Sequence, residues 1–226
     1  MKKQIIEIPQ TTYLLALLSG AALVLLTGRL LATGSWTGIF LVWNLFLAWI
    51  PLWVMLMLRD KVQRQAISKP TLVVGLGLWL LFFPNAPYLI TDLIHLKESP
   101  DNLIWYDALM GFMMAMAGLF TGMYSVLWAH RLVLKVWGQT TISIVIPSSL
   151  LLSGYGIYLG RFGRWNSWDV ISDPLALCKY IIRSVHNPLA VQTTLAFSFV
   201  MLLVYAVFYL LSQKKGVKVK PFTPFF

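Results

Sequence analysis

Six long apolar stretches, separated by short polar or charged segments, dominate the pattern of this chain. Each approaches the roughly 20 residues that an α-helix needs to cross the hydrocarbon core of a bilayer. The pattern predicts spans over about residues 12–31, 36–58, 71–88, 109–129, 141–159 and 189–211. The third stretch is the weakest, because its apolar run ends at Pro84. Either it continues to residue 96 as a broken helix, or residues 88–96 lie in the membrane interface.

The composition agrees with a lipid-exposed surface. Apolar residues make up 58% of the chain and charged residues only 12%, whereas a soluble domain carries about 25% charged residues. We therefore predict an all-α fold, an integral membrane helical bundle of about six transmembrane helices. Short amphipathic helices are expected in the two long connections, residues 83–107 and 160–188. The whole chain, residues 1–226, is predicted to form a single polytopic membrane domain.

The distribution of charge predicts the orientation. Lys and Arg outnumber Asp and Glu 18 to 8, but they fall between apolar runs, so we expect no nucleic-acid partner. A cytoplasmic N-terminus leaves six of the 18 basic residues outside: Arg29, Lys97, Arg161, Arg164, Lys179 and Arg183. The positive-inside rule then places both termini and the basic tail 212–226 in the cytoplasm. The two long connections are expected on the extracytoplasmic side.

The first candidate site lies in residues 83–96. Tyr88, Asp92 and His95 follow one another at spacings of four and three, which places them on one helical face. An acid and an imidazole beside a membrane segment cost free energy unless they have a partner or a function. One alternative is a capped interfacial helix in which Asp92 pairs with a basic residue. The other is a metal site, or a catalytic base with its orienting partner.

Asp107 directly follows Trp105 and Tyr106, just before the fourth span. An acid near a helix N-terminus is favoured by the helix dipole, which explains Asp107 without any function. The alternative is that Asp107 supplies a third ligand to a divalent metal held by Asp92 and His95. The candidate catalytic residues are accordingly Asp92, His95, Asp107 and Asp169.

The second candidate site is residues 160–169, Gly-Arg-Phe-Gly-Arg-Trp-Asn-Ser-Trp-Asp. Arg161 and Arg164 share a face if the preceding helix continues, and two guanidinium groups suit a phosphate or carboxylate. The alternative is that they pair with Asp92, Asp107 or Asp169 and hold the two connections together. Asp169 either caps the following segment or joins Asp92. The candidate ligand-binding residues are Asn85, Tyr88, Arg161, Arg164, Trp165, Asn166 and Trp168.

A stripe of small residues marks the fourth span. Its members recur at spacings of four and three: Gly111, Ala115, Gly118, Gly122, Ser125 and Ala129. Small residues allow helix backbones to approach closely in lipid. The stripe predicts close packing within one bundle or, as the second alternative, a homo-oligomer through Gly111, Gly118 and Gly122. Asn44, inside the second span, is a candidate for the bundle interior.

Four motifs of this chain resemble those of a bacterial family of multi-pass membrane proteins. They are Phe83-Pro84-Asn85-Ala86-Pro87-Tyr88, Thr91-Asp92-Leu93-Ile94-His95-Leu96, Trp105-Tyr106-Asp107 and residues 160–169. That family is catalogued as domain of unknown function 1361, and the likeness runs from about residue 45 to residue 211. The resemblance implies a bacterial cytoplasmic (inner) membrane protein. It implies no reaction.

Three functions stay open at this point. The chain is an inner-membrane protein with an extracytoplasmic Asp/His/Arg cluster that binds an anionic or lipid-linked small molecule, or a metal-dependent enzyme acting on a lipid-linked phosphate. The third alternative is a small-solute transporter or an envelope assembly or sensor component. Transport of charged solutes is disfavoured, because the deep parts of the spans hold almost no ionisable residues. The lipid bilayer is the common partner.

Overall fold

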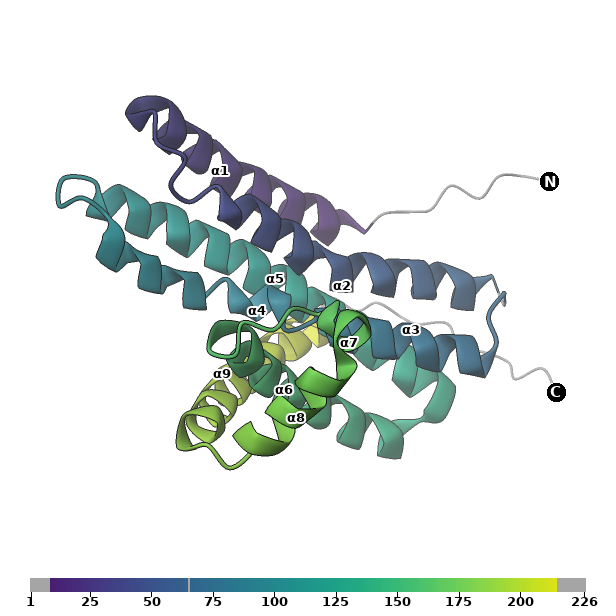
Figure 1. Ribbon diagram of the computed structural model, residues 1–226. Helices are drawn as coiled ribbons and strands as arrows, with labels where there is room; N and C mark the ends of the chain where they lie inside the picture. The colour runs from purple at the N-terminus through teal and green to yellow at the C-terminus, as the bar shows by residue number, and fades with distance from the viewer. Residues whose placement is uncertain (1–8, 65, 215–226) are drawn as a thin grey trace.

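The computed structural model describes residues 9–64 and 66–214, and this part of the chain is helical with short connections and no strand (Figure 1). The helices follow in the order α1 (Gln10–Thr33), α2 (Phe40–Gln63), α3 (Lys69–Phe82), α4 (Asn85–Tyr88), the 3₁₀ helix η1 (Thr91–Glu98), α5 (Ile104–Trp137), α6 (Gln139–Arg161), α7 (Asp169–Ser172), α8 (Pro174–Ser184) and α9 (Pro188–Lys214). The predicted all-α fold is confirmed.

Six helical segments of the described chain are long and apolar enough to cross a membrane. They are Gln10–Thr33, Phe40–Gln63, Lys69–Glu98, Ile104–Trp137, Gln139–Arg161 and Pro188–Gln213. The fourth extends well beyond the apolar window 109–129, because polar and charged residues continue the helix at both of its ends. The chain is therefore a multi-pass membrane protein built from the six predicted spans.

The third span is a broken helix. Helix α3 begins at the N-cap Ser68, whose side chain accepts a hydrogen bond from the Thr71 N–H. It ends at Phe82, because Pro84 and Pro87 lack the N–H groups that would continue the ladder. Helices α4 and η1 then carry the chain onward along α5. Residues 88–96 thus continue from α3 as a broken helical segment, and Lys69–Glu98 together form one candidate span.

Glycines of α5 receive this broken segment. A Cβ atom on Gly122 would lie 2.6 Å from the Cβ of Ala86, and one on Gly118 would lie 2.6 Å from the Ala86 carbonyl oxygen. A Cβ on Gly111 would lie 3.0 Å from Leu93. The small-residue stripe is thus occupied within the chain, as close packing of one bundle requires. Self-association through the same glycines stays a prediction.

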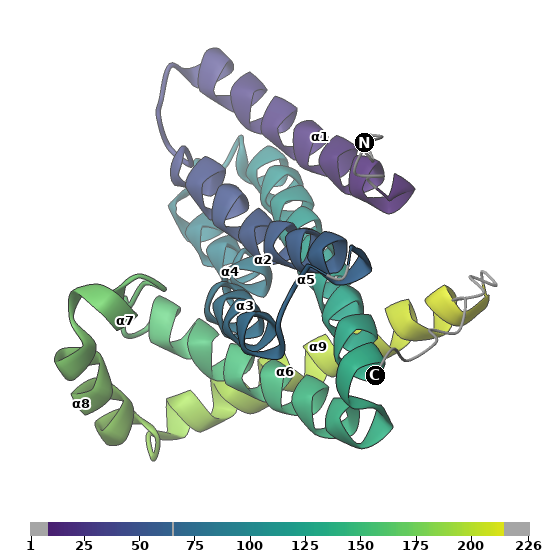
Figure 2. The ribbon, with the colours of Figure 1, turned by 90° about the vertical axis from the view of Figure 1, so that its right-hand side faces the viewer.

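Helix α5 is the centre of the bundle. Helices α1 and α2 pack on it from one side, whereas α6 and α9 pack on each other and on α5 from the other (Figures 1 and 2). Helix α4 contacts α2, α5 and α6, so it lies at the junction of the two groups. The short helices α7 and α8 flank α6 (Figure 2). They form the amphipathic part that was expected in the second long connection.

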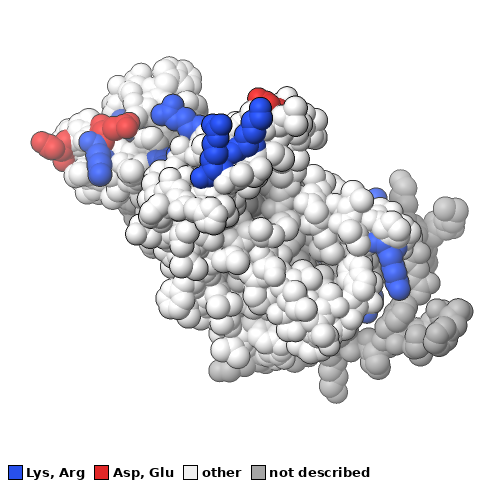
Figure 3. Space-filling model, turned by 60° about the horizontal axis from the view of Figure 1, so that its bottom comes forward, with Lys and Arg blue, Asp and Glu red and all other residues white. Residues whose placement is uncertain are grey.

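Charged side chains gather toward two regions of the molecule and leave a broad uncharged surface between them (Figure 3). We call the region with η1, the start of α5 and the end of α6 the η1 end. The opposite one, with the connection between α2 and α3, is the α2–α3 end. Residues 1–8 and 215–226, which include Lys2, Lys3 and nearly all of the predicted basic tail 212–226, lie outside the described residues.

Candidate functional site

Asp92 is the centre of a polar cluster at the η1 end. Its side chain is almost fully buried and accepts hydrogen bonds from two other helices. Asn44 of α2 donates from Nδ2 to one carboxylate oxygen at 2.8 Å, and Arg161 of α6 donates from Nη1 to the other at 3.3 Å. A buried carboxylate needs such partners, because an unpaired charge out of water is costly. The cluster therefore joins α2, η1 and α6.

His95 extends the cluster toward solvent. Its Nε2 lies 3.4 Å from Nη2 of Arg161, and its Nδ1 lies 3.4 Å from a carboxylate oxygen of Glu98. Since arginine only donates hydrogen bonds, Nε2 acts as the acceptor and the proton is assigned to Nδ1, facing Glu98. The Phe40 ring meets the imidazole edge-on at 5.0 Å. The cluster thus orients the His95 ring between Arg161, Glu98 and Phe40.

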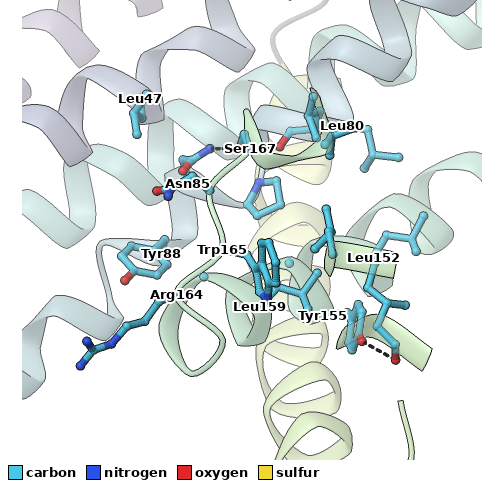
Figure 4. Close-up of a pocket in the computed structure, with 18 of the residues that line it drawn as sticks. Leu47, Leu80, Asn85, Tyr88, Leu152, Tyr155, Leu159, Arg164, Trp165 and Ser167 are labelled. Carbon is cyan, nitrogen blue, oxygen red and sulfur yellow. Dashed lines mark hydrogen bonds between the residues drawn. The ribbon is translucent and has the colours of Figure 1, made fainter. Parts of the chain in front are cut away.

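A cavity of about 680 Å³ lies beside this cluster (Figure 4). Asn44 and Tyr88 belong to both, because Asn44 holds Asp92 and the Tyr88 ring lies 6.0 Å from the Arg161 guanidinium. The cavity is lined by α2, α3, α4, α6, the connection after α6, and α7 and α8. One end is polar and the other is walled by leucines of α3 and α6.

The connection after α6 forms the polar rim of the cavity. Helix α6 ends at Arg161, and Arg164 adopts a left-handed backbone with φ of 58°. A non-glycine residue in that region costs roughly 1–2 kcal/mol. Arg161 and Arg164 therefore do not share a helical face, contrary to the expectation from their spacing. In Figure 4 the Arg164 side chain extends away from the leucine wall, and the residue is exposed.

Two side chains bind this connection to the broken end of α3. Ser167 donates to the Leu81 carbonyl at 3.0 Å, and Asn85 donates both to the Phe82 carbonyl at 2.9 Å and to Ser167 Oγ at 3.0 Å. Carbonyl groups at a helix end need partners of this kind. Ser167 was not among the predicted site residues, although a hydroxyl group that can reach a proline-broken helix end is a usable signal.

Asp169 takes neither predicted alternative: it is the first residue of α7, which has no side-chain cap hydrogen bond. Its carboxylate accepts from the Asn166 N–H at 2.7 Å and from Ser172 Oγ at 3.0 Å. The backbone hydrogen bond from Asn166, the largest influence, lowers the pKa of Asp169 below its usual value. Trp168, a candidate ligand residue, instead meets the Trp43 ring edge-on at 6.4 Å. Asp169 stabilises the turn and is not among the groups that contact Asp92 in the described chain.

Asp107 lies at the same end of the molecule as Asp92 but has a different partner. Its carboxylate pairs with Arg29 of α1, whose Nε lies at 2.7 Å and whose Nη2 lies at 3.3 Å. Nowhere in residues 9–64 and 66–214 do three or more His, Cys, Asp or Glu side chains form a group that could hold a metal. The set Asp92, His95 and Asp107 is therefore not assembled, because the first turn of α5 faces α1 at Asp107.

Six spans around a partly polar cavity define a multi-pass helical membrane protein. The family model described as "Protein of unknown function (DUF1361)" matches residues 43–207, and the chain belongs to that family. Helix α1 precedes the matched region. Neither the curated proteins nor the solved structures compared with the chain match it.

Proposed function

We propose that this protein binds an anionic amphiphile, a membrane lipid or a lipid-linked molecule, in the cavity beside Asp92. The proposal is carried by one observation: polar side chains (Asn44, Asn85, Tyr88 and Arg164) and leucines of α3 and α6 line the same cavity. An amphiphile likewise combines a polar head with an apolar chain. A charged head at the rim and an acyl or polyprenyl chain along the leucine wall would each meet a matching surface.

The apolar part of the cavity opens sideways. Gly77 of α3 and Leu152 of α6 both line it, and both are exposed, Leu152 by 54%. Leu152 precedes Arg161 by nine residues on α6, which is about 13 Å at 1.5 Å per residue. At that depth the surroundings of a six-span bundle are hydrocarbon. A lipid chain reaches the cavity there without passing through water.

The polar rim offers hydrogen-bond donors to an anionic head. Arg164 forms no salt bridge with any described residue, and Nε1 of Trp165 is buried without a hydrogen-bond partner in the same part of the chain. Arg161, in contrast, is already held by Asp92. A guanidinium group forks onto two oxygens of a phosphate or carboxylate. Arg164 is therefore the residue proposed to contact the head.

The sidedness belongs to this proposal. The α2–α3 end carries Arg59 and Lys61 in the last turns of α2, Arg64 after it and Lys69 at the start of α3, with Arg131 and Lys135 near the end of α5. Basic residues of this kind favour the cytoplasmic side. The cavity would then face the extracytoplasmic leaflet of a bacterial inner membrane, with both termini in the cytoplasm.

Native mass spectrometry of the detergent-purified protein tests the cavity as the binding site. Phosphatidylglycerol and phosphatidylcholine with identical acyl chains are added in turn, and we expect preferential retention of phosphatidylglycerol. Gly77→Leu fills the cavity, since a Cβ at Gly77 meets nothing within 4 Å. The matched control is Gly20→Leu on α1, where a Cβ also meets nothing within 4 Å.

We expect Gly77→Leu to abolish lipid retention and Gly20→Leu to leave it unchanged. Arg164→Gln should remove the preference for the anionic lipid while retaining the acyl-chain contribution, a loss of about tenfold for a charge-assisted pair. Equal retention by the two glycine variants would place the lipid elsewhere. A preference that survives Arg164→Gln would exclude this arginine as the head-group contact.

A further inference from the structure

Helix α8 lies beside α6, and not beyond its end. The hydroxyl group of Tyr155 lies 2.8 Å from Ser184 Oγ, and the Tyr180 ring stacks near Tyr158. Tyr155 precedes Arg161 by six residues, which is about 9 Å along the helix axis. In Figure 2, α8 lies next to the C-terminal part of α6 and runs across its direction. This short helix therefore sits at the level where the outer turns of α6 meet the membrane boundary.

The surface of α8 is divided into three sectors. At about 100° per residue, Leu177, Ile181 and Ser184 point together toward α6 and the cavity, and Leu177 and Ser184 are buried there. Most of the remaining surface is an exposed apolar sector formed by Leu175, Cys178, Ile182 and Val185. Beside it lies a basic sector with Lys179 and Arg183.

The apolar sector is too exposed for a water-facing helix. Leu175 is 74% exposed and Ile182 is 73% exposed, and Ile171 of α7 is 83% exposed next to them. The sector continues directly into the lipid-facing surface of the bundle, since Leu152 of α6 and Leu189 at the start of α9 are also exposed. Continuity with the surface of the spans indicates that the same solvent, lipid, covers α8.

The basic sector indicates the charge of the lipid that contacts α8. Lys179 and Arg183 are exposed, and neither forms a salt bridge with a residue that the structure describes. Basic side chains flanking an apolar helix face are attracted to anionic headgroups, by about 1 kcal/mol, or roughly fivefold, for each charge. Leu177 and Ile181, on the opposite sector, line the cavity.

We propose that α8 is embedded in the membrane interface, parallel to the surface, and that Lys179 and Arg183 gather anionic lipid beside the cavity. The apolar sector reaches the upper acyl chains, and the basic sector faces the headgroups. The supply of anionic lipid to the cavity rests on the function proposed above. The position of α8 and its choice of lipid do not depend on it.

The sole cysteine of the chain provides the probe, because Cys178 lies in the exposed apolar sector. Full-length protein is labelled there with monobromobimane and reconstituted in phosphatidylcholine vesicles. We expect strong quenching by lipids brominated near the top of the acyl chain and little quenching by aqueous iodide. The control is Cys178→Ser/Asp101→Cys, which moves the label to the exposed turn before α5 and should reverse this order. Iodide quenching at Cys178 equal to that of the control would overturn the interfacial position.

The choice of lipid is tested on the same label at equal bromine content. Brominated phosphatidylglycerol in a phosphatidylcholine background should quench more than brominated phosphatidylcholine in a phosphatidylglycerol background. Lys179→Gln/Arg183→Gln should reduce the anionic enrichment by up to about fivefold for each charge removed. Equal quenching by the two brominated lipids in the unaltered protein would overturn the anionic part.

The two proposals fail separately. Gly77→Leu is expected to leave the quenching at Cys178 unchanged, because Gly77 lies on α3, away from the apolar sector of α8. If lipid retention does not respond to Gly77→Leu while Cys178 is quenched by brominated lipid, the cavity proposal fails and the α8 proposal stands. If Gly77→Leu abolishes lipid retention while Cys178 is not quenched by brominated lipid, the α8 proposal fails and the cavity proposal stands.

Discussion

Two arginine–aspartate pairs lie at the η1 end, and their surroundings differ. Arg29 and Asp107 approach to 2.7 Å, with side chains 5% and 9% exposed, and a second contact from Nη2 completes a forked arrangement. Arg161 and Asp92 approach only to 3.3 Å, and each also contacts another polar side chain. The first pair is a buried, forked ion pair, whereas the second belongs to a hydrogen-bonded cluster of four residues beside a cavity.

The difference shows what each pair does for the fold. Arg29 and Asp107 join α1 to α5 through two short contacts, and Arg29 also donates to Thr33 Oγ1 of its own helix at 2.7 Å, which is the arrangement of a structural lock. Arg161 and Asp92 join α6 to η1 through a longer contact, and Asn44 and His95 take the remaining positions. Of the four tests below, in order of decreasing expected effect, the first and the third probe the two pairs, and the others probe the packing and the turn beside them.

Asp107→Ala should have the largest effect on stability. Removing one partner of a buried pair leaves the other charge uncompensated and typically costs about 3–5 kcal/mol. Unfolding by SDS in mixed micelles measures the loss. Asp60→Ala is the matched control, because its partner Arg64 is 42% exposed, and such pairs contribute at most about 1 kcal/mol. Similar losses in the two variants would contradict the description of Arg29–Asp107 as a buried lock.

Gly118→Ala should have the next largest effect. Its methyl group would meet Leu89 and the Ala86 carbonyl oxygen, so α4 must move away from α5. Overpacking of this kind costs about 1–3 kcal/mol, measured by the same unfolding assay. Gly20→Ala, in open space on α1, should be neutral or gain up to about 1 kcal/mol from helix propensity. Equal stability of the two variants would show that α4 is not held tightly against α5.

A double-mutant cycle on Asp92→Asn and Arg161→Gln should give a coupling free energy of about 1 kcal/mol. This value lies in the lower part of the range that is typical for side chains in contact. The long contact and the additional partners of Asp92 limit the value. The matched control is the cycle of Asp92→Asn with Arg164→Gln, which we expect to show no coupling, since these two side chains form no salt bridge in the described chain. A larger coupling for Arg164 would reverse the assignment of the two arginines.

The smallest effect is expected at Asp169, outside both pairs. The hydrogen bond from the Asn166 N–H lowers the pKa of Asp169 in the folded protein below the ordinary value of 3.8. The carboxylate therefore contributes stability that is present above that value and is lost as the pH falls through the lowered pKa. The stability difference between the unaltered protein and Asp169→Asn should shrink on acidification. Ser172→Ala, which removes a weaker donor, should reduce the difference only in part; a difference that grows in acid would contradict the lowered pKa.

The sequence predicts the membrane bundle well and its pairings only in part: Arg161 with Asp92 was one of the predicted pairs, whereas Arg29 with Asp107 was not. Six apolar runs are local features, so the spans follow from them directly. Partners across helices depend on how each helix is rotated and shifted, which no local pattern contains. Asp92 was expected either to pair with a basic residue or to bind a metal, and the structure gives it Arg161.

Arg29 is the clearest miss. In the sequence it appears only as a basic residue at the end of the first span, on the side where basic residues are rare. That exception to the positive-inside pattern was the available signal, because a misplaced arginine in a membrane segment needs an acid. Asn44, expected to face the bundle interior, does so and holds Asp92. The backbone turn at Arg164 could not be anticipated, since no glycine marks that position.

The contact between α4 and the glycines of α5 has a consequence for selectivity. Ala86 lies so close to Gly122 that the segment carrying Asn85 and Tyr88 is fixed by folding, before any guest molecule arrives. A preorganised floor of this kind discriminates by shape, because a poorly fitting molecule cannot remodel it. For the lipid proposed above, we therefore expect exchange to involve side chains at the rim, while the backbone beneath stays in place.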